Sequence, residues 1–214
     1  MARPASDIAS RIVQAARERF LFEGVDGASL RNIAKDAGTN IGMVYYYFKT
    51  KDDLFLAVIE AVYTQLLEDM RAILGAPATP EERIGRLYQR VATMSDDEFK
   101  TVRLIMREAL VSSVRLSRLA ELFLAGHIPH VMQLLQDGVG HQQLRPDLHP
   151  VAMMGAMFSL GLMPQLARRQ LATTGLPFTR LLPPSAEVAS MMFEVLMRGI
   201  GAPVATGESE KIPG

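Results

Sequence analysis

The chain contains no cysteine and no tryptophan, and aromatic residues make up only 7% of it. Without cysteine there are no disulfides, no thiolate metal ligands, no cysteine nucleophile and no thiol redox sensor. This absence suits a reducing compartment such as the cytoplasm, which is the location we expect.

An excess of charge of one sign is also lacking, because 23 basic residues balance 23 acidic ones. A neutral chain at first argues against a nucleic-acid partner. The distribution softens that objection, since residues 1–51 carry eight Lys or Arg against five Asp or Glu, which leaves +3 there and −3 in the remainder. The asymmetry is mild and by itself supports DNA binding only weakly.

Long hydrophobic runs are missing as well. The longest, Val151 to Met163, is short for a membrane span and is interrupted by Ser159. The N-terminal stretch carries too many charges for a secretory signal. We therefore expect a soluble intracellular protein without a membrane partner.

Helical spacing of apolar residues runs through the whole chain, and no strand alternation or internal repeat interrupts it. The fold class is therefore predicted to be all-α, with about nine helices. We expect them to begin near residues 6, 30, 41, 51, 80, 96, 114, 151 and 185. The first should bury one stripe, Ile8, Ile12, Ala16 and Phe20, and end at Glu23-Gly24. Pro129 should kink the long helix 114–136 near Ala125-Gly126. The predicted caps are Ser6, Ser29, Asn40, Thr50, Thr79, Ser95 and Ser185.

The most informative stretch is residues 29–54. Gly38 ends one short helix in the left-handed conformation that only glycine adopts cheaply, and Asn40 can cap the next. Thr50 opens a third helix with Asp53 three residues on, an approximate capping box. Two short helices joined by a tight glycine turn form a helix-turn-helix, whose second helix enters the DNA major groove.

This stretch closely resembles the DNA-binding pattern of TetR-family transcriptional regulators. The resemblance is strong over residues 8–60 and only architectural beyond them. One departure is Thr39-Asn40, where many members have Val-Ser. The residues that carry the resemblance are Ile33-Ala34, Ala37-Gly38, Gly42, Tyr45, Tyr47-Phe48, Lys51 and Leu54.

The resemblance implies three parts. Residues 1–50 would form a helix-turn-helix DNA-binding domain, and residues 51–200 a larger helical ligand-binding and dimerisation domain, with the helix from Lys51 as connector. Residues 201–214 are predicted to be a disordered tail. The resemblance also implies that Ser29, Tyr45 and Lys51 contact the DNA backbone, while Tyr47 and Phe48 pack inside the domain.

The residue chemistry extends the predicted DNA-binding set. The N-terminal end of the second short helix should meet base edges, Tyr45 and Tyr46 can donate hydrogen bonds to phosphates, and Lys51 adds a charge beside a helix N-terminus. The alternative is that the aromatic run 45–48 is only a core, but adjacent tyrosines on a helix cannot all face inward. The predicted contacts are Ser29, Arg31, Thr39, Asn40, Ile41, Gly42, Met43, Tyr45, Tyr46 and Lys51.

A second candidate region combines many methionines with few large aromatics, which favours an apolar interior able to repack around different guests. The family resemblance implies a small-molecule site there, coupled to the DNA-binding heads. The alternative is an ordinary core. The predicted lining residues are Tyr88, Met94, Phe99, Met106, Phe123, His127, Met153 and Met157.

Enzyme chemistry is not indicated. His127 and His130 stand three residues apart, but no further acid or cysteine completes a metal site, so we expect no metal and no cofactor. No nucleophile elbow, phosphate loop or carboxylate dyad is present either.

A third region lies in the last two helices. The helix 151–169 is apolar nearly all round, so both of its faces should be buried. A two-fold four-helix dimer interface would cover the surplus, as in the family's dimers; the alternative is a large intramolecular core. The predicted interface residues are Met154, Phe158, Leu162, Met192, Phe193 and Leu196.

Together these features predict a dimeric regulator, a repressor that binds a palindromic DNA operator and is released by a small apolar or amphipathic ligand. Two alternatives stay open. One is a DNA-binding regulator controlled by a protein partner, or acting on DNA architecture, without a ligand. The other is a helical carrier of apolar molecules whose helix-turn-helix is incidental; salt-dependent promoter binding separates it from the rest.

Overall fold

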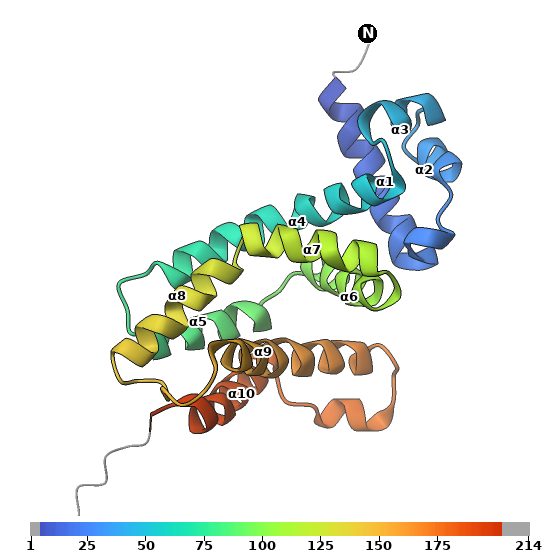
Figure 1. The fold of residues 1–214 in the computed structure, drawn as a ribbon. Helices are drawn as coiled ribbons and strands as arrows, with labels where there is room; N and C mark the ends of the chain where they lie inside the picture. Colours follow the sequence, from blue (N-terminus) through green and yellow to red (C-terminus); the bar gives the residue numbers. More distant parts are fainter. Residues whose placement is uncertain (1–4, 203–214) are drawn as a thin grey trace, which may run out of the picture. The chain divides into compact units, whose positions relative to one another are not determined.

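The computed structural model describes residues 5–202, which form ten α-helices and one short 3₁₀ helix (Figure 1). Across these residues the only strand-like pairing is an isolated bridge between Leu144 and Gly201. The prediction of an all-α fold is therefore confirmed.

The described chain divides into two compact units. Unit one contains the residues up to Gly75 together with Met94–His130, and unit two contains Ala76–Thr93 and the residues from Val131 onward. This division is based on contacts between residues, whereas the division predicted at residue 50 is one of function. The functional division stays a prediction.

Unit one is built on α4 (Lys51–Leu74). The helices α1 (Ala5–Gly27), α2 (Leu30–Asp36) and α3 (Ile41–Tyr47) gather at its N-terminal end, as Figure 1 shows. Of the predicted stripe of α1, Ile12, Ala16 and Phe20 are fully buried, and Ile8 is half-buried against the same core. Two more helices, α6 (Asp96–Val111) and α7 (Ser113–Ala125), pack against α4.

Gly24 interrupts α1 with φ of 80°, and a short further turn runs on to Gly27. The sequence placed the end of this helix at Glu23-Gly24, so the main helix ends as predicted. Its start does not match, because α1 begins at Ala5 and Ser6 lies within its first turn.

Most capping predictions are confirmed. Thr50, Thr79 and Ser95 each form a full capping box with the acidic residue three positions on, and the Asn40 side chain accepts a bond from the backbone of Met43. Two are wrong. Ser29 holds the N-cap position of α2, but within the described residues its side chain caps no backbone N–H. Ser185 lies inside its helix, because Pro184 takes the cap position.

The predicted kinked helix 114–136 is two helices. α7 ends at Ala125, and α8 (Ile128–Gly140) begins after Gly126 and His127. Pro129 therefore lies in the first turn of α8, where its missing N–H costs nothing, rather than in a helix interior. At the break, a Cβ on Gly126 would stand 2.0 Å from the Tyr63 hydroxyl of α4. The break lies where the sequence predicted a kink, at Ala125-Gly126, and the close Tyr63 hydroxyl leaves no room for a side chain at Gly126.

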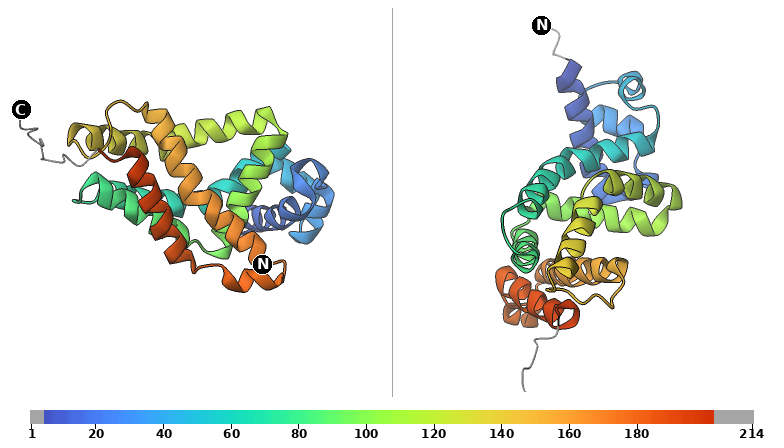
Figure 2. Two further views of the ribbon diagram at one scale, coloured as in Figure 1. Left: turned by 90° about the horizontal axis from the view of Figure 1, so that it is seen from below. Right: turned by 60° about the vertical axis from the view of Figure 1, so that its left-hand side comes forward.

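Unit two contains α5 (Pro80–Ala92), most of α8, α9 (Pro150–Ala172), the 3₁₀ helix η1 (Pro177–Leu181) and α10 (Ser185–Ile200). α9 and α10 lie side by side, and both pack on α5 (Figure 2). Gly201 and Ala202, the start of the predicted tail, pair with Leu144 and Gln143. The rest of that tail lies outside the described residues.

The expectation that α9 is buried on both faces is not met within one chain. Met153, Met157 and Leu162 are buried, but Val151, Phe158 and Met163 remain 44–55% exposed. By length and composition α9 is also the one helix of the described part that is able to cross a membrane, with 28% of its most apolar window buried. A packing helix of a bundle passes the same test.

Candidate nucleic-acid interface

The turn between α2 and α3 depends on Gly38. Its φ of 63° is left-handed, and its N–H and that of Thr39 close the turn on the carbonyls of Lys35 and Ala34. The Arg11 guanidinium donates to the carbonyl of Ala37 at 2.6 Å and would lie 3.1 Å from a Cβ on Gly38. Both the backbone conformation and the close arginine therefore favour glycine here.

The N-terminus of α3 is held by Asn40, whose Oδ1 accepts from the Met43 N–H at 3.1 Å. A Cβ on Gly42 would meet the same oxygen at 3.1 Å. Gly42 thus leaves the cap uncrowded, and the exposed backbone beside it can approach a partner closely. This is the end of the helix that the sequence predicts to meet base edges.

The aromatic run on α3 divides by direction. Tyr45 and Tyr46 are 55% and 76% exposed, whereas Tyr47 and Phe48 are half-buried and pack against the core of unit one. The alternative that the whole run is a core is therefore excluded. The inward pair matches the packing role implied by the family resemblance.

A hollow of about 470 Å³ lies on the surface of unit one beside α2, α3 and the start of α4. Its lining contains a hydroxyl, a guanidinium, a phenol and an ammonium group, and none of the described residues that line it is acidic. Such a set of donors suits a phosphate group. The lining residues are Ala28, Ser29, Leu30, Arg31, Ile41, Tyr45 and Lys51.

Half of the predicted DNA-binding residues therefore converge on one hollow, since Ser29, Arg31, Ile41, Tyr45 and Lys51 all line it. The other five do not line it; they lie on the adjoining turn and on α3, and they are Thr39, Asn40, Gly42, Met43 and Tyr46.

One contact at this hollow was missed from the sequence. The Lys51 ammonium donates to the backbone carbonyl of Asp26 at 3.0 Å. The two residues are far apart in sequence, and a backbone acceptor leaves no signal in residue type.

Comparison with known proteins identifies the family to which this arrangement belongs. Residues 12–58 match the family model described as bacterial regulatory proteins, tetR family. The uncharacterised HTH-type transcriptional regulator TtgW of Pseudomonas putida is 30% identical over 101 residues, which cover 47% of this chain and 75% of TtgW. This chain belongs to the TetR family of transcriptional regulators.

Two further comparisons support the assignment. The HTH-type transcriptional regulator PksA of Bacillus subtilis is 27% identical over 90 residues, 42% of this chain and 44% of PksA, so the match spans less than half of that relative. The transcriptional regulator FadR from Bacillus subtilis, solved in complex with stearoyl-CoA, has a TM-score of 0.70 at 19% identity over 89% of this chain and 98% of that one. At this identity the likeness shows the TetR-family fold alone.

The predicted ligand residues of this TetR-family chain fall in both units. In unit two, Tyr88, Met153 and Met157 are buried, and the Tyr88 hydroxyl donates to the Met157 carbonyl at 3.1 Å. Burial raises the pKa of Tyr88 far above its usual range. In unit one, Met94 and Phe99 are buried, whereas Met106, Phe123 and His127 are half-buried.

His127 belongs to an aromatic cluster at the break between α7 and α8. Its Nδ1 lies 2.8 Å from the Tyr63 hydroxyl, and its backbone N–H donates to the same oxygen at 3.2 Å. Burial, with a smaller effect of His130, lowers the pKa of His127 to about 4. Within the described chain no three His, Asp or Glu side chains come together as metal ligands.

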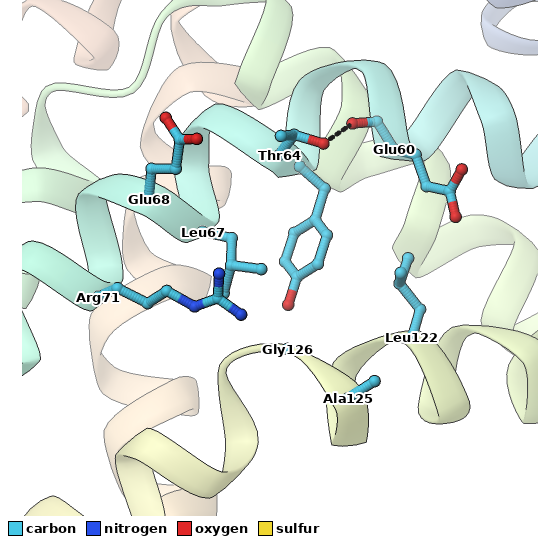
Figure 3. Close-up of a pocket in the computed structure, with 9 residues that line it drawn as sticks. Glu60, Thr64, Leu67, Glu68, Arg71, Leu122, Ala125 and Gly126 are labelled. Atoms are coloured by element: carbon cyan, nitrogen blue, oxygen red, sulfur yellow. Dashed lines mark hydrogen bonds between the residues drawn. The ribbon is translucent and has the colours of Figure 1, made fainter.

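A second hollow, of about 270 Å³, opens beside this cluster between α4 and the end of α7 (Figure 3). Arg71, Glu68 and Glu60 stand along its α4 side, and Leu122 and Ala125 along its α7 side. Among the described lining residues there is none of the predicted ligand residues. His127 is connected to the hollow only by its contact with Tyr63, which lines it.

The predicted dimer residues of unit two differ in exposure. Leu196 and Leu162 are 1% and 8% exposed, and the Phe193 ring packs against Tyr88 with 6.0 Å between ring centroids. Leu162 and Leu196 are covered within one chain and leave little surface for a second copy, whereas Phe193 is half-buried. Met154 and Met192 are half-buried, and Phe158 is 50% exposed.

Proposed function

We propose that this chain is a cytoplasmic transcriptional repressor that binds a palindromic operator as a homodimer and is released by a small amphipathic ligand. The observation that carries the DNA-binding half is the hollow lined by Ser29, Arg31, Tyr45 and Lys51 beside the exposed start of α3. A phosphate seated there would leave Gly42 and Met43 facing the bases, because the N-terminal end of a recognition helix contacts base edges.

The homodimer is supported by the apolar surface of unit two. Val151, Phe158 and Met163 of α9 and Met191 and Val195 of α10 are 39–55% exposed, on helices that pack side by side. A Cβ on Gly155 would meet nothing within 4 Å, so this part of α9 is open to a neighbouring helix. Two copies related by a two-fold axis would cover both helices at once.

The ligand half rests on two observations. FadR from Bacillus subtilis, which shares the fold, was solved with stearoyl-CoA, a long apolar chain on an anionic carrier. The hollow beside Tyr63 in this chain combines apolar Leu67 and Leu122 with charged groups, the cation of Arg71 and the carboxylates of Glu60 and Glu68, so its lining is amphipathic. A regulator that answers to a protein partner instead, with no ligand, is the alternative.

Selection from a pool of random duplexes, followed by anisotropy titration of the selected sequence, tests the DNA-binding half. We expect a palindromic site, two chains per duplex and affinity that falls steeply with salt. Binding without sequence preference would contradict the repressor function.

Adding stearoyl-CoA to the complex tests the ligand half, with free CoA as the matched control. Release by stearoyl-CoA and not by CoA would support an amphipathic effector. If neither this compound nor a library of apolar compounds releases the operator, the alternative of a protein partner is favoured.

A further inference from the structure

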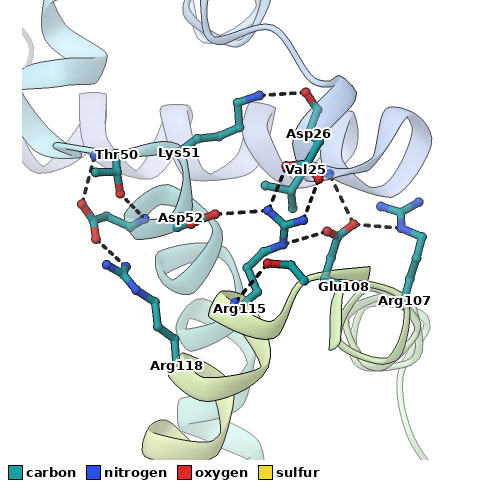
Figure 4. A network of polar contacts seen from close by, with 11 residues as sticks. Val25, Asp26, Thr50, Lys51, Asp52, Arg107, Glu108, Arg115 and Arg118 are labelled. Carbon is teal, nitrogen blue, oxygen red and sulfur yellow. Dashed lines mark hydrogen bonds and ion pairs between the residues drawn. The ribbon is translucent and has the colours of Figure 1, made fainter. Parts of the chain in front are cut away.

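Arg115, in the first turn of α7, is a buried arginine with three acidic partners on three different segments (Figure 4). Its two terminal nitrogens donate to the two carboxylate oxygens of Asp26 at 2.9 and 2.8 Å. Nη1 also reaches Asp52 at 3.3 Å, and Nε pairs with Glu108 at 3.0 Å. One guanidinium thus joins the end of α1, the start of α4 and the end of α6.

Glu108 anchors this group from α6. Its side chain is only 3% exposed, and Oε1 accepts from the Val25 N–H at 3.3 Å and from Arg107 at 3.0 Å. Arg107 in turn donates to the carbonyls of Phe20 and Leu21 at the end of α1. A buried carboxylate with this many donors is held in one place, because losing any of them would leave a charge unsatisfied.

Asp26 connects this group to the proposed phosphate site. Its carboxylate accepts two hydrogen bonds from the Arg115 guanidinium. Its backbone carbonyl accepts a hydrogen bond from the Lys51 ammonium at 3.0 Å. The Arg115 guanidinium also holds the pKa of the Asp26 carboxyl below its usual range, so the pair stays ionised near neutral pH. The position of the Lys51 ammonium is therefore tied through one residue to α7.

The two residues after Lys51 are tied to α7 as well. Asp52 pairs with Arg115 at 3.3 Å, and Asp53 with Arg118 at 2.7 Å. Asp53 also closes the capping box of α4 with Thr50. The first turn of α4 consists of Lys51, Asp52 and Asp53. Two arginines of α7 therefore hold this turn by ion pairs with two successive carboxylates.

We propose that Arg115, acting through Asp26 and Asp52, is a positioning residue for DNA binding, which holds Lys51 and the first turn of α4 where an operator phosphate docks. This inference rests on the proposed DNA-binding function. It assigns to α7, which does not line the hollow, control over how the hollow is built.

Positioning and simple electrostatics predict opposite effects at Asp26. Its side chain is 72% exposed, and removing its negative charge near a phosphate site should by itself strengthen DNA binding. If Asp26 positions Lys51, Asp26→Asn should weaken operator binding despite the lost repulsion. Because Asp26 is exposed, this change is compatible with folding. Loss of Arg115 is not, since it would leave the buried Glu108 carboxylate without its ion-pair partner.

The experiment measures operator affinity by anisotropy for the full chain and for Asp26→Asn, with Asp36→Asn as the matched control. Asp36 lies in the same unit and pairs with Arg19 at 2.6 Å, so the control removes the same charge and one ion pair without touching α7. We expect about tenfold weaker binding for Asp26→Asn, the size of a typical coupling between contacting residues, and unchanged or slightly tighter binding for the control.

A double-mutant cycle with Lys51→Ala separates positioning from a general loss of structure. Once Lys51 is absent, Asp26→Asn should no longer weaken binding, because positioning acts through that ammonium; the lost repulsion then leaves the affinity unchanged or slightly tighter. An equal loss in both backgrounds, or wild-type affinity for Asp26→Asn in the presence of Lys51, would overturn the inference while leaving the proposed function intact. Failure of the unaltered chain to bind any duplex would overturn both.

Discussion

Lys51 is the residue at which the phosphate chemistry of the hollow can be tested most directly. Lys51→Ala removes one cation and should weaken binding to every DNA sequence about tenfold, as expected for a lost charge-assisted hydrogen bond. The slope of log affinity against log salt should become shallower by about one phosphate's worth. Tyr45→Phe should act in the same direction but less strongly.

Lys49→Ala is the matched control for that measurement. Lys49 is exposed in the same unit, but it lies outside the described lining of the hollow. An unchanged affinity and salt slope for Lys51→Ala would place the phosphate elsewhere on α3.

His127 makes stability depend on pH at the residue scale. Its pKa is lowered to about 4 in the folded chain, mainly by burial, from an ordinary value of 6.5. Between these values the unfolded chain binds a proton that the folded chain does not, so stability falls as pH drops from about 6.5 toward 4. The loss should be about 2 kcal/mol, after discounting for the partial exposure of the ring.

Urea unfolding at pH 7 and at pH 4.5 measures this effect, with His127→Gln as the comparison. Glutamine can still accept from the Tyr63 hydroxyl but does not titrate, so the variant should lose much less stability on acidification. An identical loss in both proteins would assign the pH dependence to other groups. The ion-paired carboxylates Asp26 and Asp53 titrate at lower pH, because their pKa values are depressed below 3.8.

At the scale of helices, α9 and α10 carry an apolar surface that their own chain leaves open. Phe158 and Val195 are each 50% exposed. Replacing both with glutamate should give monomers on sedimentation, because like charges would meet across a two-fold axis. Leu181→Glu in η1 is the control, since Leu181 is 84% exposed and off these helices.

An intact dimer for the doubly charged variant would move the interface away from α9 and α10. Charging Phe193 or Leu196 would be a poorer test. Leu196 is 1% exposed, and the half-buried Phe193 ring packs on Tyr88, so a charge at either position would disturb the fold of unit two as well as a dimer.

At the scale of the whole molecule, ligand and operator must compete through conformation. Two recognition helices of a dimer need a separation of about 34–36 Å to enter successive major grooves. A hundredfold loss of operator affinity on ligand binding needs only about 2.7 kcal/mol of coupling, which is within the usual allosteric range.

Ala125→Trp tests whether the hollow between α4 and α7 takes part in that coupling. Ala125 lines this hollow, and an indole there would fill much of its space. We expect operator binding, measured by anisotropy, to become insensitive to compounds that release the wild type, because the indole either blocks the ligand or mimics it. Val114→Trp, at an exposed position near the other end of α7, should leave the response unchanged. Normal release of Ala125→Trp would exclude this hollow.

Most of the helices, most of their caps and the helix-turn-helix could be predicted from the sequence alone. These features depend on residues a few positions apart, such as Thr50 with Asp53, so local spacing is enough to predict them. The same locality explains why Gly38 and the stripe from Ile12 to Phe20 could be assigned correctly.

Contacts between residues that are distant in the chain could not be predicted from the sequence and are known from the folded structure. The sequence predicted the interruption near Ala125-Gly126, but the contact of Gly126 with the hydroxyl of Tyr63, 63 positions earlier in the chain, is seen only in the structure. The paired hydrogen bonds from Arg115 to Asp26 join residues that are 89 positions apart. The covering of Leu162 and Leu196 by packing within unit two is likewise seen only in the structure, because an apolar stripe shows that a face is buried but not which copy of the chain buries it.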